Sequence, residues 1–131
     1  MMFLDTGFIK ALIDSKDPYH DTAVKIKKYI DNRNEYTVIN TTVFVEVLNK
    51  SIKIKISLKE LFNDLQNNNE IVELTNEDYL KSLEISGWFG DSINFSDCTI
   101  VESMIKMNIR NIVTFDRDFK KISYINVIDD V

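Results

Sequence analysis

Short apolar runs bounded by polar residues recur along this chain of 131 residues. They are rich in Val, Ile, Leu and Phe, and each is four or five residues long. Runs of this length and composition indicate β-strands. The predicted strands cover residues 2–5, 36–40, 70–74, 111–115 and 125–128.

Between these strands, apolar residues recur at intervals of three and four positions, as on one face of an α-helix. Phe8, Ile9, Leu12 and Ile13 follow this spacing near the start of the chain. Strands that alternate with helices predict an α/β domain with a central, mostly parallel sheet flanked by helices. The predicted helices cover residues 6–15, 19–32, 42–54, 57–67, 76–89 and 96–108.

Composition favours one domain over residues 1–131, because one Pro and three Gly leave no recognisable linker or repeat. The longest apolar runs are far too short for a membrane span, and no signal-peptide pattern opens the chain. The single cysteine, Cys98, rules out an internal disulfide. We therefore expect a cytoplasmic protein with no membrane partner.

The formal net charge of −5 argues against a nucleic-acid partner, since phosphate binders are usually basic. That total misleads if several acids are gathered in a metal site, because the rest of the chain is then close to neutral. Two basic clusters remain, and they are either solvated faces or phosphate contacts. These clusters comprise Lys50, Lys53, Lys55 and Lys59, and Arg110, Arg117, Lys120 and Lys121.

Three aspartates stand where strands end or helices begin. Asp5 ends the first strand, Asp116 follows the strand at 111–115, and Asp97 lies in the first turn of a helix, three residues after Asn94. Each has a structural interpretation, because Asp is favoured at helix N-termini. Taken singly, none of them demands a functional role.

Glu46 is harder to explain structurally, because it interrupts the apolar stretch "TTVFVEVLN". A capping box needs a Ser or Thr three residues earlier, whereas Thr42 and Thr41 lie four and five residues before it. A pair with Lys50, one helical turn later, would stabilise by only about 0.2–0.5 kcal/mol. The four acids together indicate a site for Mg²⁺ or Mn²⁺ at the carboxyl edge of the sheet, where a cation would relieve their repulsion.

Four longer motifs contain these acids: "FLDTGFIKALID", "INTTVFVEVLN", "INFSDCTIVESMIKMNI" and "NIVTFDRDFKKI". In their order and spacing they resemble PIN-domain nucleases over essentially the whole chain, and its compact length resembles the VapC-type toxins. The resemblance implies metal-dependent hydrolysis of RNA phosphodiester bonds, with Asp5, Glu46, Asp97 and Asp116 as metal-binding residues. It implies that Thr114 orients water or a carboxylate, with Asp118 and Thr6 as weaker candidates.

The resemblance further implies a homodimer and a protein antitoxin, with the Lys- and Ile-rich segment 50–60 forming a helical arm that contributes to both contacts. A housekeeping RNA-processing nuclease and a non-catalytic PIN-like binding module remain alternatives. The Asp-Thr-Gly at residues 5–7 also occurs in aspartic proteases, but those have a Gly-rich all-β framework. A phosphoacceptor receiver domain would carry paired acids after its first strand, where this chain has only Asp5.

One stretch departs from the family pattern. Many PIN domains are rich in Ala after the third acid, where this chain has "CTIVESM". Helical spacing places Glu102 away from the face that carries Asp97, so we expect Glu102 at the surface. For Trp88, a packing role between helices is favoured over stacking on a base.

Overall fold

All five predicted strands form one sheet in the computed structural model, which describes residues 1–131. Every strand pair is parallel, so the predicted α/β fold with a mostly parallel sheet is confirmed. Each strand is one or two residues shorter than its apolar run. The strands are β1 (Met2–Leu4), β2 (Thr37–Asn40), β3 (Glu70–Val72), β4 (Asn111–Val113) and β5 (Asn126–Ile128).

The strand order β3-β2-β1-β4-β5 creates a switch point in the middle of the sheet. From β1 the chain moves outward through β2 to β3, and then returns to the other side of β1 to form β4 and β5. The connections after β1 and β4 therefore leave the sheet in opposite directions, and a crevice opens between the carboxyl ends of these two strands. Asp5 follows β1 here, and Thr114 follows β4.

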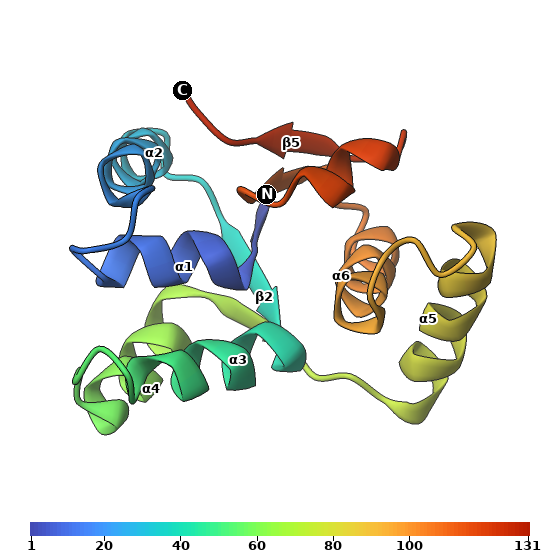
Figure 1. Cartoon of the computed structure of the whole chain (residues 1–131), viewed down its shortest axis with the longest axis horizontal. Coiled ribbons are helices and arrows are strands. Elements are labelled where there is room, and N and C mark those ends of the chain that lie inside the picture. The colour runs from blue at the N-terminus through green and yellow to red at the C-terminus, as the bar shows by residue number, and fades with distance from the viewer.

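Six helices cover the two faces of the sheet. Figure 1 shows α1–α4 gathered on one side of the strands and α5 with α6 on the other. This division follows from right-handed crossovers, because those from β1 through β2 to β3 and the one from β3 back to β4 run in opposite directions across the sheet. None of the helices combines the length and the apolar character needed to cross a membrane. The helices are α1 (Thr6–Ile13), α2 (His20–Asn32), α3 (Thr41–Ser51), α4 (Leu58–Asn68), α5 (Asn76–Trp88) and α6 (Phe95–Lys106), and a short 3₁₀ helix, η1, covers Arg117–Lys121.

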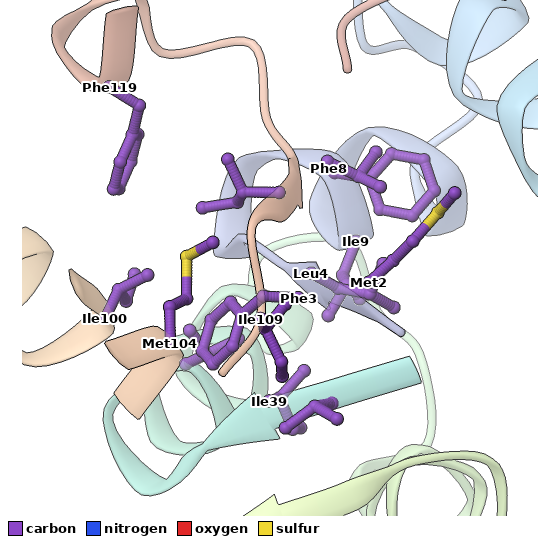
Figure 2. Close-up of a cluster of buried hydrophobic side chains, with 14 of the residues drawn as sticks. Met2, Phe3, Leu4, Phe8, Ile9, Ile39, Ile100, Met104, Ile109 and Phe119 are labelled. Atoms are coloured by element: carbon purple, nitrogen blue, oxygen red, sulfur yellow. The ribbon is translucent and has the colours of Figure 1, made fainter. Parts of the chain in front are cut away.

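The core lies between the sheet and its two helical layers. Side chains from β1, β2, α1 and α6 meet in one cluster, including Phe3, Ile39, Phe8 and Met104 (Figure 2). All three residues of β1 are buried, because helices cover both faces of the strand. The central strand is thereby fixed from two sides, and Asp5 extends directly from it.

Three expectations about individual segments are wrong. The helix predicted for residues 42–54 ends at Ser51, and the following residues form a turn in which Lys55 adopts a positive φ of 57°. The segment 50–60 is therefore neither a strand nor a continuous helical arm. Trp88 is 69% exposed, because it lies outside the stripe of α5 that faces α6.

The third wrong expectation is an exposed Glu102, because only 5% of this residue is exposed. Helix α6 is buried at every position from Asp97 to Met104, because the sheet covers one side of it and α5 covers the other. The face that the helical spacing assigns to solvent is the face against α5. A one-sided helical pattern cannot reveal a second covering layer.

Candidate metal centre

An acidic pocket of about 270 Å³ opens at the switch point of the sheet. Five parts of the fold contribute to it: the segments that follow β1 and β4, the first turn of α1, the middle of α3 and the first turn of α6. Asp5, Glu46, Asp97 and Asp116 all line this pocket. The structure therefore brings together the four carboxylates that are far apart in the sequence.

Asp5 is both the N-cap of α1 and a wall of the pocket. Its Oδ1 accepts a hydrogen bond from the backbone N–H of Thr6 at 2.8 Å. Its Oδ2 accepts one from the Thr114 hydroxyl at 2.6 Å. The capping role predicted for an aspartate at this position is compatible with a site role, because these two donors leave further lone pairs free.

Glu46 is half-buried on α3 and points toward the start of α1. Its Oε1 accepts a hydrogen bond from the Thr6 hydroxyl at 3.4 Å, a long contact that holds the carboxylate loosely. The ion pairs of the structure do not include Glu46 with Lys50. Lys50 instead lines the same pocket, one helical turn farther along α3.

Asp97 is held in place through its backbone, while its carboxylate stays free. Asn94 is the N-cap of α6, and its Oδ1 accepts the Asp97 N–H at 2.8 Å. Asp97 Oδ2 is buried and has no hydrogen-bond partner. A buried carboxylate oxygen without a donor is costly, so this atom is the strongest single indication of an absent positive partner.

Asp116 and Asp118 follow β4 in a tight turn. The backbone N–H of Asp116 donates to the Thr114 hydroxyl at 3.0 Å, and the N–H of Asp118 donates to Asp116 Oδ1 at 2.9 Å. Carboxylate oxygens of Asp97, Asp116 and Asp118 lie within 4.8 Å of one another. Asp118 also pairs with Lys121 at 3.0 Å, so part of its charge is already balanced.

Burial and mutual repulsion shift the acids of this pocket. Burial, followed by the charges of Asp5, Asp116, Glu46 and Asp118, raises the pKa of Asp97 to about 7. Burial also raises the pKa of Asp5, although the hydrogen bonds from Thr114 and Thr6 oppose that rise. Both shifts show that negative charge is disfavoured here without a compensating cation.

The donor set fits a hard divalent cation. The candidate ligand atoms in the pocket are oxygens, chiefly those of the four carboxylates, which suits Mg²⁺ or Mn²⁺. The Cys98 thiol points away toward the carbonyl of Ile93, and His20 contacts the carbonyl of Ala11 in another part of the molecule. Soft or imidazole ligands are thus missing from this pocket.

Asn40 is a supporting residue that the sequence patterns did not reveal. It is fully buried at the N-cap of α3, where its Oδ1 accepts the N–H of Val43 at 3.1 Å. Its amide nitrogen donates to Thr99 O at 3.3 Å and to Ser103 Oγ at 3.1 Å, both on α6. Asn40 thereby ties the helix that carries Glu46 to the helix that carries Asp97. A polar residue at the junction of an apolar strand and a helix was the available signal.

The fold and the site together define a parallel α/β domain with a carboxylate pocket at its switch point. A family model described as PIN domain matches residues 2–124. The chain belongs to the PIN-domain family. A search among curated proteins found no match.

Solved structures share this fold across almost their whole length. The VapC20 toxin of Mycobacterium tuberculosis, described as cleaving the sarcin–ricin loop, has 20% identity and a TM-score of 0.77, with 95% of this chain and 97% of that chain covered. VapBC2 of Rickettsia felis, bound to a promoter DNA fragment, has 18% identity, a TM-score of 0.73 and 98% coverage of both chains. A toxin–antitoxin complex of Klebsiella pneumoniae has 15% identity and a TM-score of 0.74, with 98% and 96% covered.

Proposed function

We propose that this protein is a Mg²⁺- or Mn²⁺-dependent endoribonuclease and the toxin of a VapBC-type toxin–antitoxin pair. The observation that carries the proposal is the unpartnered, buried Asp97 Oδ2 in a pocket shared with three further carboxylates. Membership of the PIN-domain family and the VapC fold of similar structures support it. The catalytic unit in this proposal is the whole of residues 1–131.

The proposed metal ligands are Asp5, Glu46, Asp97 and Asp116, with Asp118 close enough to join them. When bound, a divalent cation supplies positive charge against the scissile phosphate and makes water more acidic. Hydroxyl groups of the chain itself position two of these ligands. Thr114 orients the Asp5 carboxylate, and Thr6 steadies Glu46.

Lys50 is the proposed phosphate contact within the pocket, because it brings a cationic side chain to a wall of carboxylates without being neutralised by Glu46. A polyanionic substrate needs such a contact to approach an acidic site. We expect the target to be single-stranded or looped RNA in the cytoplasm. Activity should fall with added salt, as for other phosphate-binding proteins.

A protein antitoxin and a homodimer complete the proposal. Two of the similar structures are toxin–antitoxin complexes, which supports an antitoxin partner for this chain. A small gene beside this one, whose product binds the protein and stops RNA cleavage, would support the toxin assignment. Cleavage without any such neighbour would favour the housekeeping alternative.

The test is cleavage of short single-stranded RNAs by the wild type and by Asp97→Asn, each with Mg²⁺, with Mn²⁺ and with excess chelator. Glu102→Gln is the matched control, because Glu102 lies on the same helix and is 5% exposed against 6% for Asp97. We expect cleavage by the wild type and the control with metal, and none by Asp97→Asn. Equal activity of folded Asp97→Asn, or full activity in chelator, would remove the proposed chemistry. A protein that binds RNA without cleaving it would be the non-catalytic module.

A further inference from the structure

Two aromatic rings form a stack at the rim of the acidic pocket. Tyr19 and Phe115 lie with ring centroids 4.4 Å apart and planes only 10° from parallel. Phe115 itself lines the pocket. In the sequence it stands between Thr114 and Asp116, so the backbone fixes its place beside the proposed metal ligands.

Phe115 also contacts the core, through a tilted rather than stacked pair of rings. Phe115 contacts Phe8 with ring centroids 6.4 Å apart, and Phe8 is completely buried. Phe115 is half-buried between them. One face of the Tyr19 ring is therefore covered by a firmly packed neighbour, which leaves the outer face as the surface of the stack.

Tyr19 is also held from its backbone side. The connection between α1 and α2 is pinned by Lys10, whose Nζ lies 2.6 Å from Asp17 and 3.4 Å from Asp14. The N–H of Tyr19 donates to Asp17 Oδ1 at 2.8 Å, and its carbonyl accepts the N–H of Ala23 at 2.8 Å. Tyr19 is nevertheless 52% exposed. A rigid, flat, half-exposed aromatic surface is what an unpaired nucleobase needs for stacking.

We propose that the exposed face of Tyr19 is a stacking site for an unpaired nucleobase close to the scissile phosphate. The inference rests on the proposed nuclease function and assigns it a base-binding position beside the metal site. Stacking on an aromatic ring tolerates every base, because all bases present a π-face. The site therefore selects unpaired strands over duplexes rather than one sequence over another.

The decisive experiment compares removal of the ring with removal of the base. Short single-stranded RNAs carry one abasic residue at successive positions around the cleaved bond, and kcat/KM is measured for the wild type and for Tyr19→Leu, which keeps an apolar contact with Phe115. At one position we expect base removal to lower the wild-type kcat/KM about tenfold or more. The same removal should leave kcat/KM of Tyr19→Leu unchanged, and Tyr19→Trp should restore the wild-type pattern.

Tyr36→Leu is the matched control. Tyr36 is 55% exposed, and it precedes β2 at the amino edge of the sheet, opposite to the pocket. We expect it to respond to abasic residues as the wild type does. If the abasic penalty at every position is the same in Tyr19→Leu as in the wild type, the stacking site is wrong while the nuclease function stands.

A binding measurement keeps the two proposals separate. The same RNAs carry a fluorescent adenine analogue at single positions and are titrated with Asp97→Asn, which we expect to bind them without cleaving. Tyr19→Leu and Tyr36→Leu are each added to Asp97→Asn. Quenching at one position that is lost with Tyr19→Leu and kept with Tyr36→Leu supports stacking. This result would stand even if the wild type does not cleave RNA and the proposed function fails. Equal quenching in the Tyr19 and Tyr36 variants, or no quenching at any position, overturns the stacking site.

Discussion

Asp97 carries a large electrostatic cost in the pocket. Its pKa is raised to about 7 by burial and by its acidic neighbours, whereas in the unfolded chain it ionises near the ordinary aspartate pKa of 3.8. The folded protein without metal therefore loses stability as the pH rises from about 4 through 7, because the unfolded chain releases this proton first. Above that range the penalty no longer grows.

Asp97→Asn removes this penalty, since the amide has no charge. In excess chelator we expect its free energy of unfolding to exceed that of the wild type by about 2–4 kcal/mol at pH 8, with little difference near pH 4. Urea unfolding between these pH values measures the gap. Asp21→Asn, which changes an exposed acid on α2, should show no such pH-dependent gap. A constant difference at all pH values would contradict the electrostatic explanation.

At the residue scale, the three aspartates of the pocket could be predicted because strand ends and helix starts are visible in the apolar pattern, and Glu46 because it interrupts an apolar stretch. Asp5 and Asp116 follow strands, and parallel strands bring their carboxyl ends to one edge. Asn40 also ends a strand, but that position alone does not reveal its role, and Tyr19 has no such signal. Their roles depend on contacts with residues distant in the chain, and no periodicity records such contacts.

At the scale of elements, α3 and α6 must keep their relative position for Glu46 and Asp97 to share one pocket. Asn40 fixes that position through hydrogen bonds with the Val43 N–H on α3 and with Thr99 and Ser103 on α6. A second link joins the hydroxyls of Thr99 and Thr42 at 3.2 Å. Because Asn40 is fully buried, water cannot take its place as the hydrogen-bond partner of these groups.

Asn40→Ala should therefore affect both stability and activity. We expect a loss of about 1–3 kcal/mol in the free energy of unfolding, because buried donors and acceptors lose their partner. RNA cleavage should fall more than the folded fraction alone explains. Chemical denaturation and cleavage assays at a temperature where the variant is folded separate the two effects. Asn126→Ala, at the exposed edge strand β5, is the control, and an equal effect there would contradict a special role for Asn40.

Element boundaries show where local patterns stop being informative. The Lys–Ile alternation after Lys50 has the period of a strand, yet no neighbouring strand pairs with it and the chain turns instead. The sequence predicts an exposed Glu102 because helical spacing alone assumes that only one face of α6 is covered. The packing of α5 against the other side of α6 is a tertiary contact, which the local pattern does not reveal.

At the scale of the whole molecule, the switch point ties the parallel topology to the pocket. The alternation of strands and helices predicted the sheet, but the strand order β3-β2-β1-β4-β5 was not predicted. That order makes β1 and β4 neighbours, and thereby places Asp5 beside Thr114. A net charge of −5 is concentrated in part at this crevice, so a cation bound there would stabilise the entire fold.

Mn²⁺ or Mg²⁺ should raise the melting temperature of the wild type, because a ligand that binds only the folded state stabilises it. At a cation concentration about 100 times the dissociation constant, the expected gain is about 2.7 kcal/mol. The gain should be larger at pH 8 than at pH 5, since protons compete with the cation for Asp97. Calorimetry at constant ionic strength measures it. The double variant with Glu46→Gln and Asp97→Asn should lose most of the gain, whereas Glu102→Gln should keep it. A rise of equal size in the double variant would mean that the cation binds elsewhere, because that variant lacks two of the four carboxylates around the pocket.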